Sequence, residues 1–141
     1  SDGRKIAASN YTVKYSSGCK KVGKYKVKIT FKNNYTGSLT KTYTILPKGT
    51  KLSKLSPASK GFQAKWAKQA GQFSGYEIRY STSKNMAKAK TVPVSKYKTS
   101  TAVKKLKARK KYYVQIRTYQ KSSGTKYYSA WSAAKSVTTK K

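Results

Sequence analysis

Residues 106–120, LKARKKYYVQIRTYQ, combine tyrosines with cations and contain no acid. Alternating tyrosines and cations can stack on sugar rings or bases and can hold anionic groups. The alternative is an ordinary core strand with a solvated outer face, on which Glu77 is neutralised by neighbouring cations. The sequence leaves both interpretations open. If the stretch is a binding face, the candidate polyanion- or partner-binding residues are Arg79, Tyr113, Arg117, Tyr119, Lys121 and Lys126.

Groups that could carry out catalysis are scarce in this chain. There is no His, so neither a Ser/His/Asp nor a Cys/His nucleophile arrangement can be built. The two acids, Asp2 and Glu77, lie far apart in the sequence and make a poor glycosidase pair. A single cysteine, Cys19, provides neither a disulfide nor a zinc cluster. The sequence therefore predicts a protein that is not an enzyme and that needs no cofactor or metal.

The charge of the chain is extreme and comes mostly from lysine. The 141 residues include 34 Lys or Arg and two acids, which gives a formal net charge of +32. Arginine suits planar, bidentate recognition, whereas lysine is a flexible point charge. The dominance of lysine predicts diffuse attraction to polyanions. High charge opposes compaction, but an aromatic fraction of 13% and alternating apolar residues favour folded β structure.

The first part of the chain has the period-two pattern of strands. Strands are expected over residues 11–16, 23–32 and 39–46, with a turn at 33–37. Three strands are few for an independent core, so this part is interpreted as the back half of a small sandwich. Its unpaired edges invite strand addition. Residues 1–48 are therefore expected to depend on an upstream segment, on packing against the second part of the chain, or on edge-strand pairing with a second copy, and the oligomeric state is left open.

The second part of the chain predicts a complete sandwich. Residues 47–51 have linker composition, and seven short strands separated by turns follow them. Pro93 predicts an edge strand because proline lacks one ladder donor, and residues 127–139 are expected to form one last strand. The residues predicted to face the core are Phe62, Ala64, Trp66, Tyr76, Ile78, Tyr80, Tyr112, Val114, Ile116 and Thr118.

Residues 51–139 resemble a fibronectin type III domain. Trp66 stands where that family keeps a strand-B tryptophan, and GYEIRY, which contains Tyr76, is similar to the family's GYxVxY strand. Leu106 and Tyr112 match the LxPxTxY corner, in which the tyrosine hydroxyl bonds back to the backbone. Position 108 is Ala where the family has proline. The resemblance implies a seven-stranded sandwich with these four residues, Trp66, Tyr76, Leu106 and Tyr112, as structural hallmarks.

Residues 10–16 (NYTVKYS) and 22–45 are similar to the second half of a bacterial Ig-like repeat. The stretches GYEIRYSTS, LKARKKYYVQIRTYQ and YYSAWS are similar to type III modules near the C-terminus of large surface proteins of Gram-positive bacteria. The resemblance implies an all-β chain with a partial Ig-like unit over 1–48 and a type III domain over 49–141. It also implies a secreted or cell-surface location. No apolar run approaches the ~20 residues of a membrane span, no signal peptide is recognised, and the abrupt opening is expected of a fragment.

These observations favour a non-catalytic, strongly cationic spacer or adhesion module. Its expected partners are anionic polymers, namely teichoic acids and sulfated or sialylated glycans. One alternative is a released type III polypeptide that acts as the protein ligand of a host receptor, as the secreted hormone-like irisin of this family does. Another is a non-specific nucleic-acid binder, although no nucleic-acid-binding fold is recognised. A further alternative is the C-terminal appendage of an enzyme. The sequence does not separate them.

Overall fold

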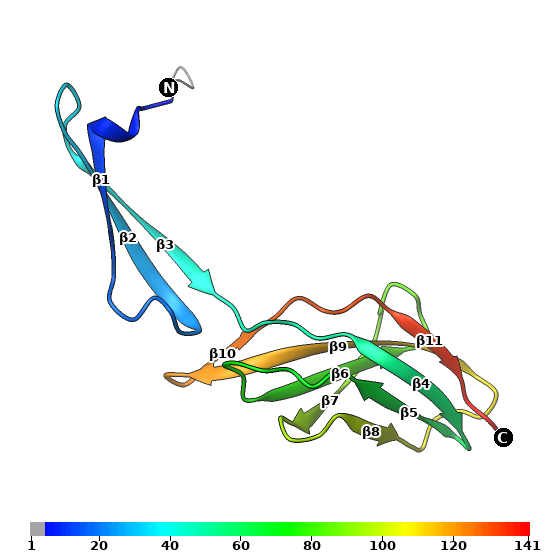
Figure 1. The fold of residues 1–141 in the computed structure, drawn as a ribbon. Helices are drawn as coiled ribbons and strands as arrows, with labels where there is room; N and C mark the ends of the chain where they lie inside the picture. Colours follow the sequence, from blue (N-terminus) through cyan, green and yellow to red (C-terminus); the bar gives the residue numbers. More distant parts are fainter. Residues whose placement is uncertain (1–4) are drawn as a thin grey trace. The chain divides into compact units, whose positions relative to one another are not determined.

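The structure is a computed structural model that describes residues 5–141. The chain divides into two compact units, Ser1–Ile45 and Leu46–Lys141, each with its own sheets. Apart from the 3-10 turn η1 (Ala8–Asn10), every regular element within the described residues is a β-strand (Figure 1). The predicted all-β class is thus confirmed. The division falls slightly before the predicted one, since Pro47 is buried and belongs to the second unit.

The first unit is one antiparallel sheet in the order β1-β2-β3. Its strands, β1 (Tyr11–Tyr15), β2 (Gly23–Phe31) and β3 (Ser38–Ile45), correspond to the three predicted ones. Tyr11 pairs with Phe31 and Val13 with Ile29, so the alternation gathers aromatic and aliphatic side chains on one face and the lysines of β1 and β2 on the other. The apolar face is open to solvent at Val13 and Tyr15, which are 43% and 60% exposed.

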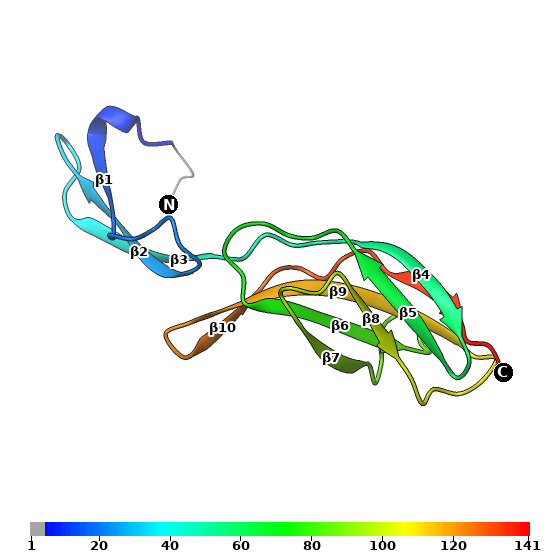
Figure 2. The same cartoon turned by 60° about the horizontal axis from the view of Figure 1, so that its bottom comes forward.

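The second unit is a sandwich of two sheets, which Figures 1 and 2 show as two stacked layers. One sheet has the order β4-β5-β8, and the other has the order β10-β9-β6-β7, with β11 also pairing with β9. Strand β7 lies at an edge, which confirms the placement expected from Pro93. The strands are β4 (Leu52–Ala58), β5 (Gly61–Trp66), β6 (Gly75–Ser81), β7 (Lys90–Ser95), β8 (Ser100–Val103), β9 (Lys111–Ser122), β10 (Thr125–Tyr128) and β11 (Lys135–Thr138).

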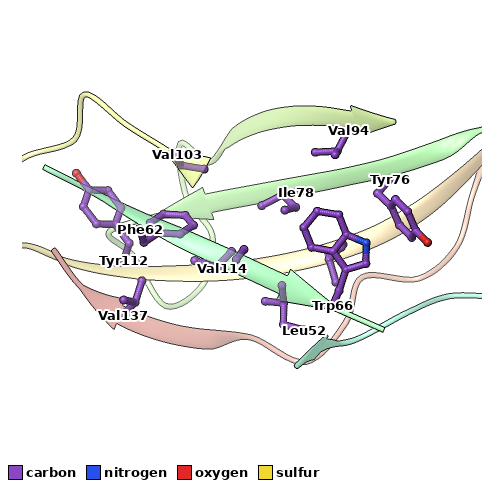
Figure 3. Packing of buried hydrophobic residues seen from close by; sticks show 12 residues of the cluster. Leu52, Phe62, Trp66, Tyr76, Ile78, Val94, Val103, Tyr112, Val114 and Val137 are labelled. Carbon is purple, nitrogen blue, oxygen red and sulfur yellow. The ribbon is translucent and has the colours of Figure 1, made fainter. Parts of the chain in front are cut away.

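The core lies between these two sheets and contains the predicted residues (Figure 3). Trp66 of β5 is 3% exposed, and its ring centroid lies 5.3 Å from that of Tyr76 on β6. Ile78, Val114 and Ile116 are fully buried. Within residues 5–141 the Trp66 indole nitrogen has no hydrogen-bond partner, and it lies on the side of the ring that faces Tyr76 (Figure 3).

The tyrosine corner forms although Ala108 replaces the family's proline. The Tyr112 hydroxyl accepts a hydrogen bond from the Lys107 backbone N–H at 3.3 Å, and Tyr112 is buried. The neighbouring Leu106 N–H donates to the Lys60 carbonyl at 2.8 Å. These bonds fix the β8–β9 loop without a proline, and the predicted bond from the tyrosine back to the backbone is confirmed.

The composition of residues 47–51 predicts a linker, but the structure shows that they are bonded to the sandwich. The Thr118 hydroxyl donates to the Lys48 carbonyl at 2.8 Å, and the Thr50 hydroxyl donates to the Ala67 carbonyl at 2.9 Å. Thr118 is fully buried in β9, and its hydroxyl needs an acceptor there. The segment supplies that acceptor and so belongs to the sandwich.

The predicted single strand at 127–139 is wrong, because the chain leaves the ladder between β10 and β11. Ser129 donates its N–H to the Thr118 carbonyl at 3.1 Å, and its hydroxyl accepts from the Thr118 N–H at 3.0 Å. Ser132 repeats this pattern with Ile116 at 2.8 and 3.1 Å. Each serine hydroxyl thus replaces a backbone carbonyl. From Ser129 to Ser132 the chain advances three residues, while its partner β9 advances only two, from Thr118 to Ile116. The extra residue places Trp131 on the outer face.

Candidate functional site

The outer face of β9 carries a stack of cations and aromatic rings. The Arg117 guanidinium carbon lies 3.6 Å from the ring centre of Tyr128 and 4.2 Å from that of Trp131. The Arg79 guanidinium carbon, from β6, lies 4.4 Å from the same Trp131 ring. We call Tyr128, Arg117, Trp131 and Arg79 the arginine–aromatic stack. Cations over ring faces at these distances are attracted by the ring quadrupole, most strongly over Trp.

Glu77 closes the stack from the neighbouring strand. It lies directly opposite Arg117 in the β6–β9 pairing. Arg117 donates from both Nε and Nη2 to one oxygen of Glu77, Oε2, at 2.8 and 2.6 Å. The Glu77 and Arg117 side chains are 11% and 22% exposed. The pair is therefore largely shielded from water. Charge-assisted hydrogen bonds are strong in such surroundings.

Arg79 is held by a neutral partner instead of an acid. Its Nε donates to the Gln115 Oε1 at 2.8 Å, and the Gln115 amide nitrogen donates to the Ser132 carbonyl at 2.8 Å. Burial and the nearby Arg117 charge lower the pKa of Arg79, although an arginine stays charged at neutral pH. The two arginines are thus fixed by side chains of the protein itself.

The predicted residues Tyr119, Lys121 and Lys126 come together at the end of the β9–β10 hairpin. Lys126 Nζ lies 5.0 Å from the Tyr119 ring centre, and Lys126 pairs with Lys121 across the strands. Like charges directly opposite each other destabilise a hairpin. The Tyr119 ring lies over Gly75, where an added Cβ would sit 2.7 Å from the tyrosine oxygen. Both lysines are exposed and face solvent.

Tyr113 lies at the opposite end of the outer row of β9 from the hairpin lysines. Six residues separate it from Tyr119, which at about 3.4 Å per residue places the two Cα atoms roughly 20 Å apart. Arg79 pairs with Gln115, only two residues from Tyr113. Lys111 Nζ lies 5.6 Å from the Tyr113 ring centre. The predicted residues therefore form a row along the outer face, with Tyr113 at one end, Arg79 and Arg117 in the middle, and Tyr119, Lys121 and Lys126 at the other end.

The sequence interpretation missed the aromatic half of the stack. Tyr128 and Trp131 are three residues apart, and treating them as one strand placed them on opposite sides of a sheet. The signal was the pair of serines at the same spacing, Ser129 and Ser132. A three-residue period in an extended segment is not a strand period. It brings both rings to the same side, against Arg117.

The fold and its hallmark residues agree with a comparison to protein families. The model of the fibronectin type III domain matches residues 46–135. The chain belongs to the fibronectin type III family. The matched range contains the buried Trp66, the Tyr112 corner and all members of the arginine–aromatic stack. No curated protein sequence matches the chain.

Solved structures that resemble this type III chain share its fold. The FN1–FN3 domains of chicken CNTN1 have a TM-score of 0.60 and 23% identity, over 86% of this chain and 44% of that one. The fn3 domain of human contactin 1 has a TM-score of 0.54 and 17% identity, over 70% and 86%. A β-1,2-glucanase from Parabacteroides distasonis has a TM-score of 0.54 and 15% identity, over 83% and 18%. The chain thus spans less than half of two of these proteins.

Fibronectin type III domains are generally non-catalytic adhesion or spacer modules, and they are commonly extracellular. Over residues 5–141, no helix has the length and apolar character to cross a membrane. The candidate site of this chain lies on the outer face of the sheet that contains β6 and β9.

Proposed function

We propose that this chain is a non-catalytic spacer and adhesion module of a secreted or cell-surface protein of a Gram-positive bacterium, and that it binds anionic polymers. The expected polymers are teichoic acids and sulfated or sialylated glycans. The module character follows from the family, and the bacterial origin rests on the resemblance of the sequence to surface-protein modules. The binding of polyanions rests on the charge distribution.

One observation carries the proposal, namely the position of Glu77. It is the only acidic residue among the described residues, and it is buried and paired with Arg117. No Asp or Glu side chain is therefore exposed over residues 5–141, whereas the lysines of this range lie at the surface. An acid-free cationic surface attracts any polyanion, and binding is favoured further by the release of counterions from the polymer.

The predicted residues have different roles in this proposal. Arg79 and Arg117 hold the rings of the stack, because their guanidinium groups already bind Gln115 and Glu77. The exposed pair Lys121 and Lys126 at the hairpin supplies the charge on this face, with the Tyr119 ring beside Lys126. Tyr113 lies at the other end of the same outer row, two residues from Gln115, the partner of Arg79.

The test is the binding of the full chain to heparin and to purified teichoic acid at several salt concentrations. Affinity is expected to fall steeply with salt. Protein–DNA complexes with 6–10 phosphate contacts lose about 10³–10⁵ in affinity between 50 and 200 mM salt, and a loss of at least about 10²-fold is expected here by the same mechanism. Retention of the chain by neither polymer at 50 mM salt would contradict the proposal.

A matched pair of variants separates the hairpin from diffuse attraction. Lys121→Gln with Lys126→Gln removes two charges from the hairpin, and Lys24→Gln with Lys26→Gln removes two exposed charges from β2. The hairpin variant is expected to lose more affinity than the β2 variant. Equal losses would show that the polymer recognises only the total charge of the chain.

A further inference from the structure

A second feature of the sandwich is a pocket between the β6–β7 loop and the β8–β9 loop. Its volume is about 460 Å³, which is within the range of about 300–1,000 Å³ found for small-molecule sites. Tyr80 and the buried Tyr112 line it, and Tyr112 lies at the end of the core away from Trp66 and Tyr76 (Figure 3). None of the predicted binding residues lines this pocket.

Both loops that border the pocket are held by hydrogen bonds. The Ser81 hydroxyl donates to the Ala87 carbonyl at 2.6 Å and accepts from the Ser83 N–H at 3.0 Å. The Asn85 side chain accepts from the Ala87 N–H at 3.0 Å. On the other side, the Lys107 N–H donates to the Tyr112 hydroxyl. The pocket is therefore formed before any ligand arrives, which lowers the ordering cost of binding.

The opening of the pocket is cationic. Four lysines line it, two from each loop region, and no lining residue is acidic. All four are exposed, so they surround the mouth while the tyrosines lie inside. The lysines are Lys88, Lys90, Lys105 and Lys107. Lysine side chains are flexible point charges, which suit anionic groups at variable positions better than one planar group.

The residues that line the pocket offer three kinds of contact: an aromatic surface, hydroxyl groups and positive charge. The ring of Tyr80, in edge contact with Tyr112 at 6.1 Å, offers an apolar aromatic surface. The Thr82 hydroxyl can donate and accept hydrogen bonds, whereas the Ser83 hydroxyl already donates to Asn85 Oδ1 at 2.7 Å and can only accept. The lysines bring positive charge. An inorganic anion would use the lysines and a hydroxyl donor but not the aromatic surface, whereas a sugar ring that carries carboxylate or sulfate groups would use all three.

We propose that this pocket binds one anionic sugar residue, a uronate or a sulfated hexose, of a glycan chain. The proposal deepens the polyanion-binding function and rests on it. It assigns the part of recognition that depends on the sugar to the pocket, and leaves the salt-sensitive, diffuse part to the exposed lysines of the remaining surface.

The experiment is an NMR titration of the ¹⁵N-labelled full chain with a sulfated heparin disaccharide. Amide shifts are expected in the two loops, around Ser83 and Lys107. Lys88 and Lys105 have left-handed backbone conformations, with φ values of 50° and 59°. This allows a variant that removes both charges without straining the loops. Asn adopts this left-handed region more readily than most residues, so Lys88→Asn with Lys105→Asn should keep the loops folded. It is expected to lower disaccharide affinity at least tenfold.

Two controls define the ligand. Lys24→Gln with Lys26→Gln removes the same charge from the first unit and is expected to change disaccharide affinity less than twofold. Tyr80→Leu keeps an apolar wall but removes the ring, and is expected to weaken the disaccharide without affecting inorganic sulfate. If sulfate displaces the disaccharide at equal concentration and Tyr80→Leu has no effect, the pocket is only an anion site and the sugar proposal fails. Stronger shifts with a mononucleotide than with the disaccharide would also overturn it.

The pocket and the proposed function can fail separately. If heparin polymer binds the chain but the disaccharide leaves the loop resonances unmoved, the pocket proposal is overturned and polyanion binding stands. If the disaccharide fills the pocket but neither heparin nor teichoic acid binds at 50 mM salt, the pocket stands and the polymer-binding function is overturned.

Discussion

Replacing Glu77 by Gln tests whether one acid organises the outer face of the sandwich. The change leaves a hydrogen-bond acceptor in place but removes the charge that two Arg117 nitrogens share at 2.8 and 2.6 Å. Breaking a buried ion pair by removing one partner costs about 3–5 kcal/mol. Arg117 is 22% exposed, so water screens part of the remaining charge. A loss at the lower end, about 3 kcal/mol, is expected in the free energy of unfolding.

This loss should be easy to measure. One kcal/mol lowers Tm by about 4–8 °C in a domain of up to about 100 residues, so a fall of about 12–24 °C is expected. Urea unfolding followed by tryptophan fluorescence gives the free energy directly. Both tryptophans, Trp66 and Trp131, lie in the second unit, so the signal reports on the sandwich alone. Trp131 also reports on the stack, because Arg117 and Arg79 lie over its ring.

A double-mutant cycle with Arg117→Met isolates the pair from its surroundings. Met keeps an apolar side chain between the rings of Tyr128 and Trp131 while removing the charge. A coupling energy of about 1.5–3 kcal/mol between Glu77 and Arg117 is expected for charges in contact. A coupling near zero, together with a loss below about 1 kcal/mol for Glu77→Gln, would refute the reasoning. The stack would then be held by ring packing and the ion pair would be a passive surface contact.

Three further changes test the core, a turn and the pH response. Trp66→Ala should cost about 3–5 kcal/mol because the indole is 3% exposed, and a small loss in calorimetry would contradict its central position. Gly61→Ala should destabilise the sandwich, since its Cβ would lie 2.3 Å from the Val103 carbonyl oxygen; an unchanged urea midpoint would show that the β4–β5 turn can shift. Burial, and then the neighbouring Tyr112, raises the pKa of Tyr80 in the folded protein above 10.0. The contribution of neutral Tyr80 to the free energy of unfolding is therefore present below pH 10.0 and is lost as the pH rises through the pKa of the folded state. Tyr80→Phe should therefore reduce the loss of stability above about pH 10, and identical alkaline unfolding curves would exclude this role.

Much of the fold could be predicted because period-two alternation records which side of a strand is buried. Val114 and Ile116 are fully buried, as their spacing required. The tyrosine corner was recognised from Leu106 and Tyr112 despite the missing proline. The failure at residues 127–139 has a physical cause: Ser129 and Ser132 replace backbone acceptors of the ladder. A period-two pattern predicts a strand whose backbone groups all pair with the neighbouring strand. It does not predict a segment in which side-chain hydroxyls take the place of backbone carbonyls.

The candidate site was harder to predict than the fold. The sequence showed which residues share the outer side of β9, but not which of their polar groups were already bonded. The sequence left open whether Glu77 is neutralised by neighbouring cations or Arg117 is a free binding group, and the structure places Glu77 opposite Arg117 and pairs the two. The pocket beside Tyr80 was not predicted at all, because its lysines come from two loops that are distant in the sequence. Loop proximity depends on the tertiary fold, which local patterns do not contain.

The stacked arginines and the lysines therefore have different surroundings. Arg79 and Arg117 are used inside the stack, where stacking and directed hydrogen bonds need a planar group. The lysines of residues 5–141 are exposed to solvent, and they are the groups that the proposed function assigns to the polymer. This division affects how binding and stability are coupled. The unfolded chain keeps all of its lysines, so a polyanion that recognises charge alone also binds the unfolded state and stabilises the fold little. A polymer that raises Tm at constant ionic strength must instead use a feature that exists only in the folded sandwich, such as the hairpin pair or the pocket between the loops.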